Sequence, residues 1–315
     1  MEISLAAPYL NEATLDEAER VLREEFFVGG ESVKAFESDL CSYFDVDHAV
    51  TVDSGTRALQ FALEALGIGG GDTVVTTPAT FIATANVIVR TGATPRFVDI
   101  DLDTYGPDIE ELSRICKNES IDAVMPVHLY GYPMDIDRIR EAVGDVPIVS
   151  DACQAHGAKR DGYKIGTRSD VAGLSFYPSK NMTVGGDGGV LLTDDSEIAR
   201  IAKSLRDVGR SESGYEHERI GYTARLNTVN AAIGRNQLAE LDEWNARRQT
   251  IATRYTEAFA DLDLALPPSG NESIMPAWYF YTVRYGEREA LGNHLSDQAI
   301  DTGRQYRQPV HLQQP

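Results

Sequence analysis

The feature that most limits how this chain can fold is an alternation of short apolar segments with helical ones. The first apolar segment, His48–Val52, is followed by a turn at 54–56 and a helical pattern to about Leu66, which four glycines within 67–72 interrupt. Further short, apolar strands are predicted at Thr73–Thr76, Thr94–Val98, Ala123–Pro126, Ile148–Ser150, Gly173–Phe176 and Gly189–Leu192. Strands that are apolar on both faces indicate an α/β fold, with a mostly parallel sheet between layers of helices.

Helical patterns continue on both sides of this region. Apolar residues at helical spacing predict helices at 12–24, 31–44, 195–207 and 228–260. After Pro267-Pro268 the pattern predicts a strand at Trp278–Tyr285 and a helix at Glu287–Asp301, with no closing element behind them. We therefore expect a large domain over 1–240, including the N-terminal helical segment, and a smaller C-terminal α+β domain over 241–315. One strand and one helix make a thin domain, so we expect this unit to be incomplete and the sequence to be truncated.

The composition argues against several kinds of partner. The net charge is −20, and a surface this acidic repels nucleic acid and anionic membranes, so neither is expected as a partner. No apolar run approaches the roughly 20 residues that a membrane span needs, and the N-terminus lacks a signal-peptide pattern, so a cytoplasmic protein is expected. Only 6 of the 29 basic residues are lysine, which together with the acidity predicts a salt-adapted, halophilic surface.

Several common cofactor and metal motifs are absent from the sequence. The three cysteines are widely spaced, which suits neither disulfides nor zinc, and no His/Cys cluster predicts a metal, so we expect none. Neither a Walker A pattern nor G-x-G-x-x-G occurs, so nucleoside triphosphates and dinucleotides have no support as ligands.

Polar residues instead follow the predicted strands, where ligands bind in open parallel sheets. Asp151 follows an apolar strand, where a carboxylate needs a cation or hydrogen-bond donors, although helix capping explains many such aspartates. Lys180 lies between an apolar strand and a glycine-rich stretch, where an amine can become nucleophilic. The turn containing Gly55 and Thr56 can hold phosphate at a helix start, or can be an ordinary cap. Phe81 can stack on a flat ring, or can be a core residue.

Taken together, these residues resemble the sugar aminotransferases of the DegT/DnrJ/EryC1/StrS family, from about residue 5 to residue 315. The segments that carry the resemblance are Gly30–Glu37, Ser54–Leu59, Thr80–Ala85, Pro126–Gly131, Asp151–Ala158, Ser175–Asn181 and Gly186–Gly189. Their order and spacing are specific as a set. The resemblance implies a fold-type I aminotransferase that binds pyridoxal 5'-phosphate and forms a homodimer with active sites shared at the interface.

The same resemblance implies a role for each matching residue. Lys180 would be the Schiff-base lysine and proton shuttle, and Asp151 would pair with the protonated ring nitrogen. Gln154 would hydrogen-bond the ring hydroxyl, and Phe81 would stack on the ring. The phosphate would be held by Gly55, Thr56 and Ser175. The implied cycle passes through pyridoxamine phosphate, with glutamate as the amino donor and a 3- or 4-keto sugar linked to a nucleotide as the acceptor. Such a reaction belongs to amino-sugar and polysaccharide biosynthesis.

The sequence departs from the family pattern in two places. In the family, an asparagine that precedes an arginine reaches the phosphate bound by the neighbouring subunit. This chain has Thr223 at that position, so Thr223 or Asn227 is the candidate for that contact. Relatives also continue past the region of Pro309-Val310-His311. Tyr306 and His311 are candidates for contacts with the sugar.

Three other functions stay open. The first is a dehydratase that uses pyridoxamine phosphate, which the family builds with histidine in place of Lys180. The second is a non-catalytic or regulatory protein on the same fold, which the intact Asp151, Gln154 and Lys180 disfavour. The third is a general amino-acid transaminase, which the sugar-family segments disfavour.

Overall fold

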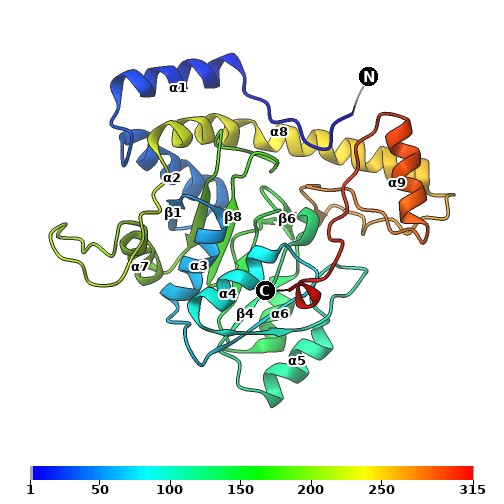
Figure 1. The fold of residues 1–315 in the computed structure, drawn as a ribbon, viewed down its shortest axis with the longest axis horizontal. Helices are drawn as coiled ribbons and strands as arrows, with labels where there is room; N and C mark the ends of the chain where they lie inside the picture. Colours follow the sequence, from blue (N-terminus) through cyan, green and yellow to red (C-terminus); the bar gives the residue numbers. More distant parts are fainter. Residues whose placement is uncertain (1–2, 315) are drawn as a thin grey trace.

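The computed structural model describes residues 3–314, in which a central sheet is covered by helices (Figure 1). The strands of this sheet are β1 (His48–Val52), β2 (Thr73–Thr76), β3 (Thr94–Phe97), β4 (Ala123–Met125), β5 (Val149–Asp151), β8 (Val171–Ser175) and β9 (Gly189–Thr193). Their spatial order is β3-β2-β4-β5-β8-β9-β1, with β4 and β5 joined by isolated parallel bridges. Neighbouring strands run parallel from β3 to β8, whereas β9 is antiparallel to both of its neighbours.

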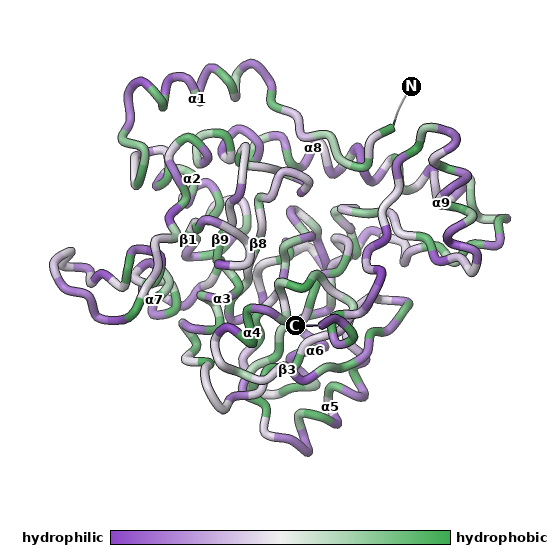
Figure 2. The backbone as a smooth tube through the Cα atoms, in the orientation of Figure 1, coloured by the Kyte–Doolittle hydropathy of each residue, from purple (hydrophilic) through white to green (hydrophobic). Residues whose placement is uncertain are grey.

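Helices cover this sheet because their apolar faces match its apolar strands. The helices are α1 (Glu12–Glu24), α2 (Glu31–Phe44), α3 (Gly55–Ala65), α4 (Ile82–Thr91), α5 (Ile109–Asn118), α6 (Ile136–Val143), α7 (Ser196–Arg206), α8 (Thr228–Phe259) and α9 (Arg288–Asp297). Short 3-10 turns lie at Leu129–Gly131 and Val310–Leu312. The largest core cluster packs α3, α4 and α7 against the strands, with Phe61 and Leu63 fully buried. In Figure 2 the central strands are more hydrophobic than the outlying α9. Within the described residues, no helix is long and apolar enough to cross a bilayer.

Most of the predicted elements are confirmed. The helices at 12–24 and 31–44 and the strands at 48–52 and 73–76 have the predicted bounds. The α/β class is confirmed, and the parallel arrangement holds except at β9. Residues 228–259 form a single helix, α8, which continues through position 240, where the sequence pattern placed a domain boundary.

The strand predicted at Trp278–Tyr285 is wrong. A strand needs a partner along its length, but within residues 3–314 this segment pairs by backbone bridging only at Arg284, with Ala265. Trp278 has a left-handed backbone with φ of 48°, which a strand does not accommodate. The backbone N–H groups of Tyr279 and Phe280 both donate to the Tyr130 carbonyl instead.

A small sheet that the sequence pattern did not reveal connects the C-terminal part to residues 159–164. It consists of β6 (Lys159–Arg160), β7 (Tyr163–Lys164) and β10 (Ile274–Met275), in the order β10-β6-β7. Residues 274–275 thus attach the C-terminal part to a hairpin that follows β5. Helix α9 lies beside the far end of α8 (Figure 1) and has no buried residue.

Candidate active site

Two glycines hold the start of α3 against the ends of two strands. A Cβ atom added to Gly55 would lie 2.4 Å from the Ser175 Cβ, and one added to Gly189 would lie 2.5 Å from the Ser54 carbonyl carbon. Larger residues would therefore push the helix away from β8 and β9. Because Ser175 and Gly189 face each other across these strands, the helix start, the end of β8 and the start of β9 meet at one point.

This meeting point offers free hydrogen-bond donors. Ser54 caps α3, since its Oγ accepts a hydrogen bond from Arg57 N at 3.2 Å. Among residues 3–314, no acceptor is bonded to the backbone N–H of Gly55 or of Thr56. Ser175 adds a hydroxyl next to them. Backbone donors at the positive end of a helix dipole are suited to an anion such as phosphate.

Asp151 ends β5 as a buried carboxylate, with 6% of the residue exposed. Its Oδ2 accepts a hydrogen bond from Thr84 Oγ1 at 2.7 Å, and its Oδ1 accepts one from Cys153 N at 3.1 Å. Within the described chain no lysine, arginine or histidine forms an ion pair with it. A buried carboxylate without a countercharge is costly, so this position is suited to a ligand that brings a positive charge.

Lys180 lies on a tight turn just beyond β8. Its backbone N–H donates to the Tyr177 carbonyl at 2.8 Å, and Pro178 occupies the second position of the turn, where a fixed φ is favourable. The Lys180 Nζ lies 4.2 Å from the centroid of the Tyr279 ring, in a cation–π contact. The Tyr279 hydroxyl is 3.0 Å from Ser179 Oγ. Tyr279 is not recognisable as a site residue from the sequence, because no local pattern connects it to a lysine 99 positions earlier.

The sheet brings Asp151 and Lys180 to the same edge. Strands β5 and β8 are neighbours with Asp151 opposite Gly173, so both side chains follow the carboxyl ends of adjacent strands. Both charges also act on Cys153. Burial and the Asp151 carboxylate raise the pKa of the Cys153 thiol well above its ordinary value, and the Lys180 ammonium opposes this.

Gln154, Tyr306 and Phe81 form the next part of the site. Gln154 is buried, with Oε1 accepting from Tyr130 N at 2.7 Å and Nε2 donating to the Tyr306 hydroxyl at 2.9 Å. The Tyr306 ring lies 6.4 Å, centroid to centroid, from the ring of Phe81. Phe81 is 55% exposed, so it is not a core aromatic and its ring is accessible to a ligand.

Three other candidate residues lie outside this group of contacts. Thr223 is exposed and bridges to Asp207 through its backbone. The side chain of Asn227 caps α8 by accepting from Asn230 N at 2.8 Å. His311 is exposed at the β3 edge of the sheet, with its ring 5.9 Å from the ring of Phe97.

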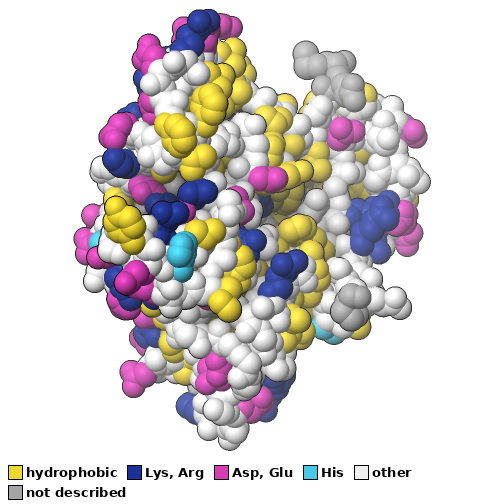
Figure 3. Space-filling view, turned by 60° about the vertical axis from the view of Figure 1, so that its left-hand side comes forward, with side chains coloured by type: hydrophobic (Ala, Val, Ile, Leu, Met, Phe, Trp, Pro, Cys, Tyr) yellow, Lys and Arg dark blue, Asp and Glu magenta, His cyan; other side chains and the backbone are white. Residues whose placement is uncertain are grey.

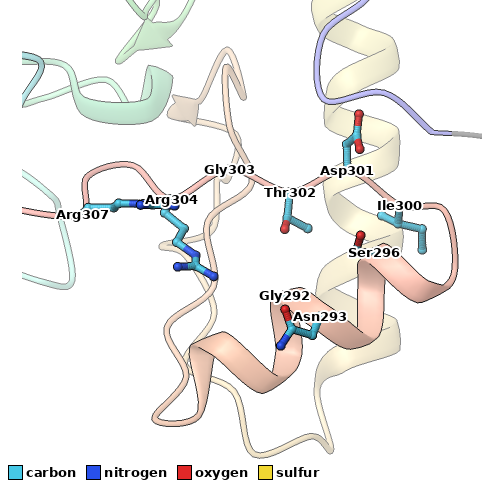
Figure 4. Close-up of a pocket in the computed structure, with 9 residues that line it drawn as sticks. All are labelled: Gly292, Asn293, Ser296, Ile300, Asp301, Thr302, Gly303, Arg304 and Arg307. Atoms are coloured by element: carbon cyan, nitrogen blue, oxygen red, sulfur yellow. The ribbon is translucent and has the colours of Figure 1, made fainter.

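A separate pocket of about 410 Å³ lies between α9 and residues 300–307 (Figure 4). Asn293, Ser296 and Arg307 are among its lining residues, as is Arg304, which forms an ion pair with Glu289 at 2.6 Å. None of the candidate cofactor residues lines this pocket. Among the described residues, no group of three His, Cys, Asp or Glu side chains is arranged to hold a metal ion.

The arrangement at the sheet edge fits pyridoxal phosphate. Asp151 offers an uncompensated negative charge, and the start of α3 offers free N–H donors for a phosphate. Lys180 provides the amine, and the exposed ring of Phe81 can cover the face of a planar ligand. These groups come from β5, β8, α3 and the start of α4, so the packed sheet fixes their relative positions.

The chain is similar to known proteins along nearly its whole length. The sequence profile of the DegT/DnrJ/EryC1/StrS aminotransferase family matches residues 8–315. The dTDP-3-amino-3,4,6-trideoxy-alpha-D-glucose transaminase of Streptomyces venezuelae is 42% identical over 298 residues, or 93% of this chain and 77% of that protein.

Solved structures are also similar to this chain over nearly its whole length. The crystal structure of S. venezuelae DesV in complex with a ketimine intermediate has a TM-score of 0.92 and 40% identity, covering 96% of this chain and 81% of that chain. NtdA from Bacillus subtilis, solved with bound cofactor PMP, has a TM-score of 0.88 and 26% identity, covering 97% of this chain and 72% of that chain.

Proposed function

Because the chain belongs to the DegT/DnrJ/EryC1/StrS aminotransferase family, we propose that it transfers an amino group to the keto group of a nucleotide-linked sugar, using pyridoxal phosphate. The observation that carries this proposal is the buried Asp151 carboxylate, which has no countercharge in the described chain and shares a sheet edge with Lys180. When bound, pyridoxal phosphate supplies an electron-withdrawing ring that stabilises negative charge on the reacting carbon.

The roles of the surrounding residues follow from their positions. Asp151 would keep the ring nitrogen protonated, and the side-chain amide of Gln154 would donate to the ring hydroxyl. Phe81 would cover one face of the ring. The phosphate would accept hydrogen bonds from the N–H groups of Gly55 and Thr56 and from the Ser175 hydroxyl. Lys180 would hold the cofactor through its amine and, when released, carry a proton to and from the reacting carbon.

The substrate side is proposed from the C-terminal part. Residues 1–240 would carry the cofactor, and residues 241–315 would contribute Tyr306 and Tyr279 to the wall beside it. We propose glutamate as the amino donor, and a sugar with its keto group at C3 or C4 as the acceptor. The relative in S. venezuelae is named for a 3-amino sugar, which favours C3.

A second copy of the chain is proposed to complete the site. Large apolar side chains are exposed near the starts of α2 and α8 and in the loop after α7: Phe26 is 80% exposed, and Tyr215 and Ile220 are each 92% exposed. Figure 3 shows hydrophobic side chains grouped on this side of the molecule. Covering them with a second copy would remove apolar area from water and place Thr223, exposed nearby, within reach of a neighbour. Asn227 fits that role less well because its side chain already caps α8.

The test compares the wild-type chain with Lys180→Ala and with Lys164→Ala as a matched control. Lys164 also lies over a tyrosine ring, with Nζ 3.7 Å from the Tyr43 centroid, but its strand, β7, belongs to the small sheet and not to the sheet that carries Asp151. Pyridoxal phosphate is added, the visible absorbance is recorded, and borohydride then fixes the cofactor to its lysine for peptide mapping. In the wild type and in Lys164→Ala we expect a visible absorbance band from the bound cofactor. We also expect borohydride to attach the cofactor to Lys180 in both proteins.

Amino transfer is then followed with glutamate and with 3-keto and 4-keto nucleotide sugars. Lys180→Ala should lower the transfer rate by about 10³-fold or more, because it removes the group that moves the proton. A label on Lys164, or a band that Lys180→Ala retains, would contradict the proposed site. A normal band with no transfer to any keto sugar would favour the regulatory, non-catalytic function instead.

A further inference from the structure

Two threonine hydroxyls, those of Thr84 and Thr80, form a chain of contacts that leads to the Asp151 carboxylate. Neither threonine has a role in the function proposed above. Thr84 Oγ1 donates to Asp151 Oδ2 at 2.7 Å, and Thr80 Oγ1 lies 2.8 Å from Thr84 Oγ1. All three residues are buried, with 6% of Asp151 and 1% of each threonine exposed. Hydrogen bonds to an ionised group are stronger than neutral ones, and burial strengthens them further.

The number of protons that each group can donate fixes the direction of the hydrogen bonds among Thr80, Thr84 and Asp151. A carboxylate only accepts hydrogen bonds, and each threonine hydroxyl has one proton to donate. Thr84 therefore gives its proton to Asp151, so the contact between the two hydroxyls must be a donation from Thr80 to Thr84. The relay runs from Thr80 through Thr84 to Asp151, and each bond polarises the next.

The start of α4 shows that these hydroxyls are not used for the ordinary local purpose. The N-cap residue of α4 is Phe81, whose side chain forms no capping bond. Among the described residues, side-chain caps are present at the starts of α1, α3, α5, α6, α7 and α8, whereas α2 and α9, like α4, start without one. Threonine is a far better N-cap residue than phenylalanine, yet Thr80 lies one position too early and its hydroxyl is directed to Thr84. A local rule broken beside a functional group points to a functional use.

We propose that Thr84, supported by Thr80, is a positioning residue that orients the Asp151 carboxylate toward the protonated ring nitrogen of the cofactor. Thr84 holds Oδ2, and Cys153 N holds Oδ1 at 3.1 Å, so the plane of the carboxylate is fixed from both oxygens. The remaining lone pairs are then available to a single N–H donor at the open edge of the sheet. This inference rests on the proposed function and adds that the relay selects for a ring with a proton on its nitrogen.

The experiment measures equilibrium binding of two compounds by dialysis to the full chain. One compound is pyridoxal phosphate, and the other is its 1-deaza analogue, in which the ring nitrogen is replaced by C–H. In Thr84→Val, which keeps the shape but loses the hydroxyl, we expect binding of pyridoxal phosphate to weaken about tenfold. Binding of the analogue should change less than about twofold, because it offers Asp151 no N–H. The control Thr84→Ser, which keeps a hydroxyl, should stay within about twofold for both compounds.

The outcomes separate this inference from the proposed function. An equal loss of both compounds in Thr84→Val would mean that Thr84 acts through packing alone, which overturns the inference. Thr80→Val provides a second test if Thr84→Val does not fold. Loss of the polarising bond from Thr80 should reduce the preference for binding pyridoxal phosphate over its 1-deaza analogue about threefold. Unchanged discrimination in Thr80→Val would then overturn the relay while leaving the proposed function standing. If the wild-type chain binds neither compound, the proposed function itself fails.

Discussion

The two sides of the candidate site are built in opposite ways. On the side formed by residues 48–193, Asp151 and Gln154 lie at the ends of strands whose neighbours are almost fully buried. On the side formed by residues 261–314, the buried hydrophobic residues among those described are Ala277, Trp278 and Val310, and α9 buries none. The cofactor side is thus fixed by packing, whereas the other side is attached through a few hydrogen bonds and aromatic contacts.

This difference teaches which half of the site can vary. Packed sheets hold side chains to within a few tenths of an ångström, which suits a cofactor whose ring, phosphate and amine must all be met at once. A segment with few buried contacts opens more easily and tolerates changes in sequence. We infer that the cofactor side is common to many reactions and that the C-terminal side adapts to the sugar.

The largest effect on stability is expected when one methyl group is added on the cofactor side, which is formed by residues 48–193. Gly55→Ala places a Cβ 2.4 Å from Ser175 Cβ, so the free energy of unfolding should fall by about 3 kcal/mol, as overpacking does. Gly286→Ala in the C-terminal part is the matched control. A Cβ there meets no atom within 4 Å, and the change should stay within about 0.5 kcal/mol. Urea unfolding of both variants measures this, and equal effects would remove the contrast.

The next largest effect is on how stability depends on pH, and it again distinguishes the two sides of the site. His128 is fully buried after β4, and its Nδ1 accepts a hydrogen bond from Met134 N at 3.1 Å. Burial lowers the pKa of His128 from 6.5 to about 3. Between those values the unfolded chain binds a proton that the folded chain does not, so stability is present above pH 6.5 and is lost as pH falls toward 3.

The variant His128→Asn keeps an acceptor for Met134 N but does not titrate. Between pH 5.5 and 4.5 the wild type should lose about 1.4 kcal/mol more stability than this variant. His156 is also fully buried, and burial lowers its pKa to about 3, so the variant itself stays pH-dependent. The control is His294→Asn on exposed α9, which should follow the wild type. Unfolding in urea at the two pH values measures the difference, and parallel curves for His128→Asn and wild type would contradict it.

The smallest effect on overall stability should come from the contact that joins the two sides. Tyr306→Phe removes the hydrogen bond from Gln154 Nε2, which is worth about 1 kcal/mol. Amide hydrogen exchange should become faster in residues 300–314 and stay unchanged in β5 and β8. Tyr285→Phe, at an exposed tyrosine of the same region, serves as the control and should change neither. Loss of protection in β5 would show that the C-terminal side is part of the packed unit after all.

The sequence by itself determined most elements of the central sheet and its helices, and the positions of the polar groups that follow them. The bounds of α1, α2, β1 and β2 were predictable because apolar spacing, glycines and prolines act over a few residues. Asp151, Gln154 and Lys180 were recognisable because the carboxyl ends of parallel strands share one edge of a sheet. These signals are local, so they can be read without knowing which strands are neighbours.

Only the tertiary structure decided how distant segments meet. The antiparallel direction of β9, the missing strand at 278–285 and the place of Tyr279 under Lys180 depend on partners far along the chain. The hydrogen bond from Thr84 to Asp151 spans 67 positions, and nothing in the sequence of α4 marks it beyond an uncapped start. Hydrogen bonds and side-chain contacts are satisfied in three dimensions, and a local pattern cannot state which partner satisfies them.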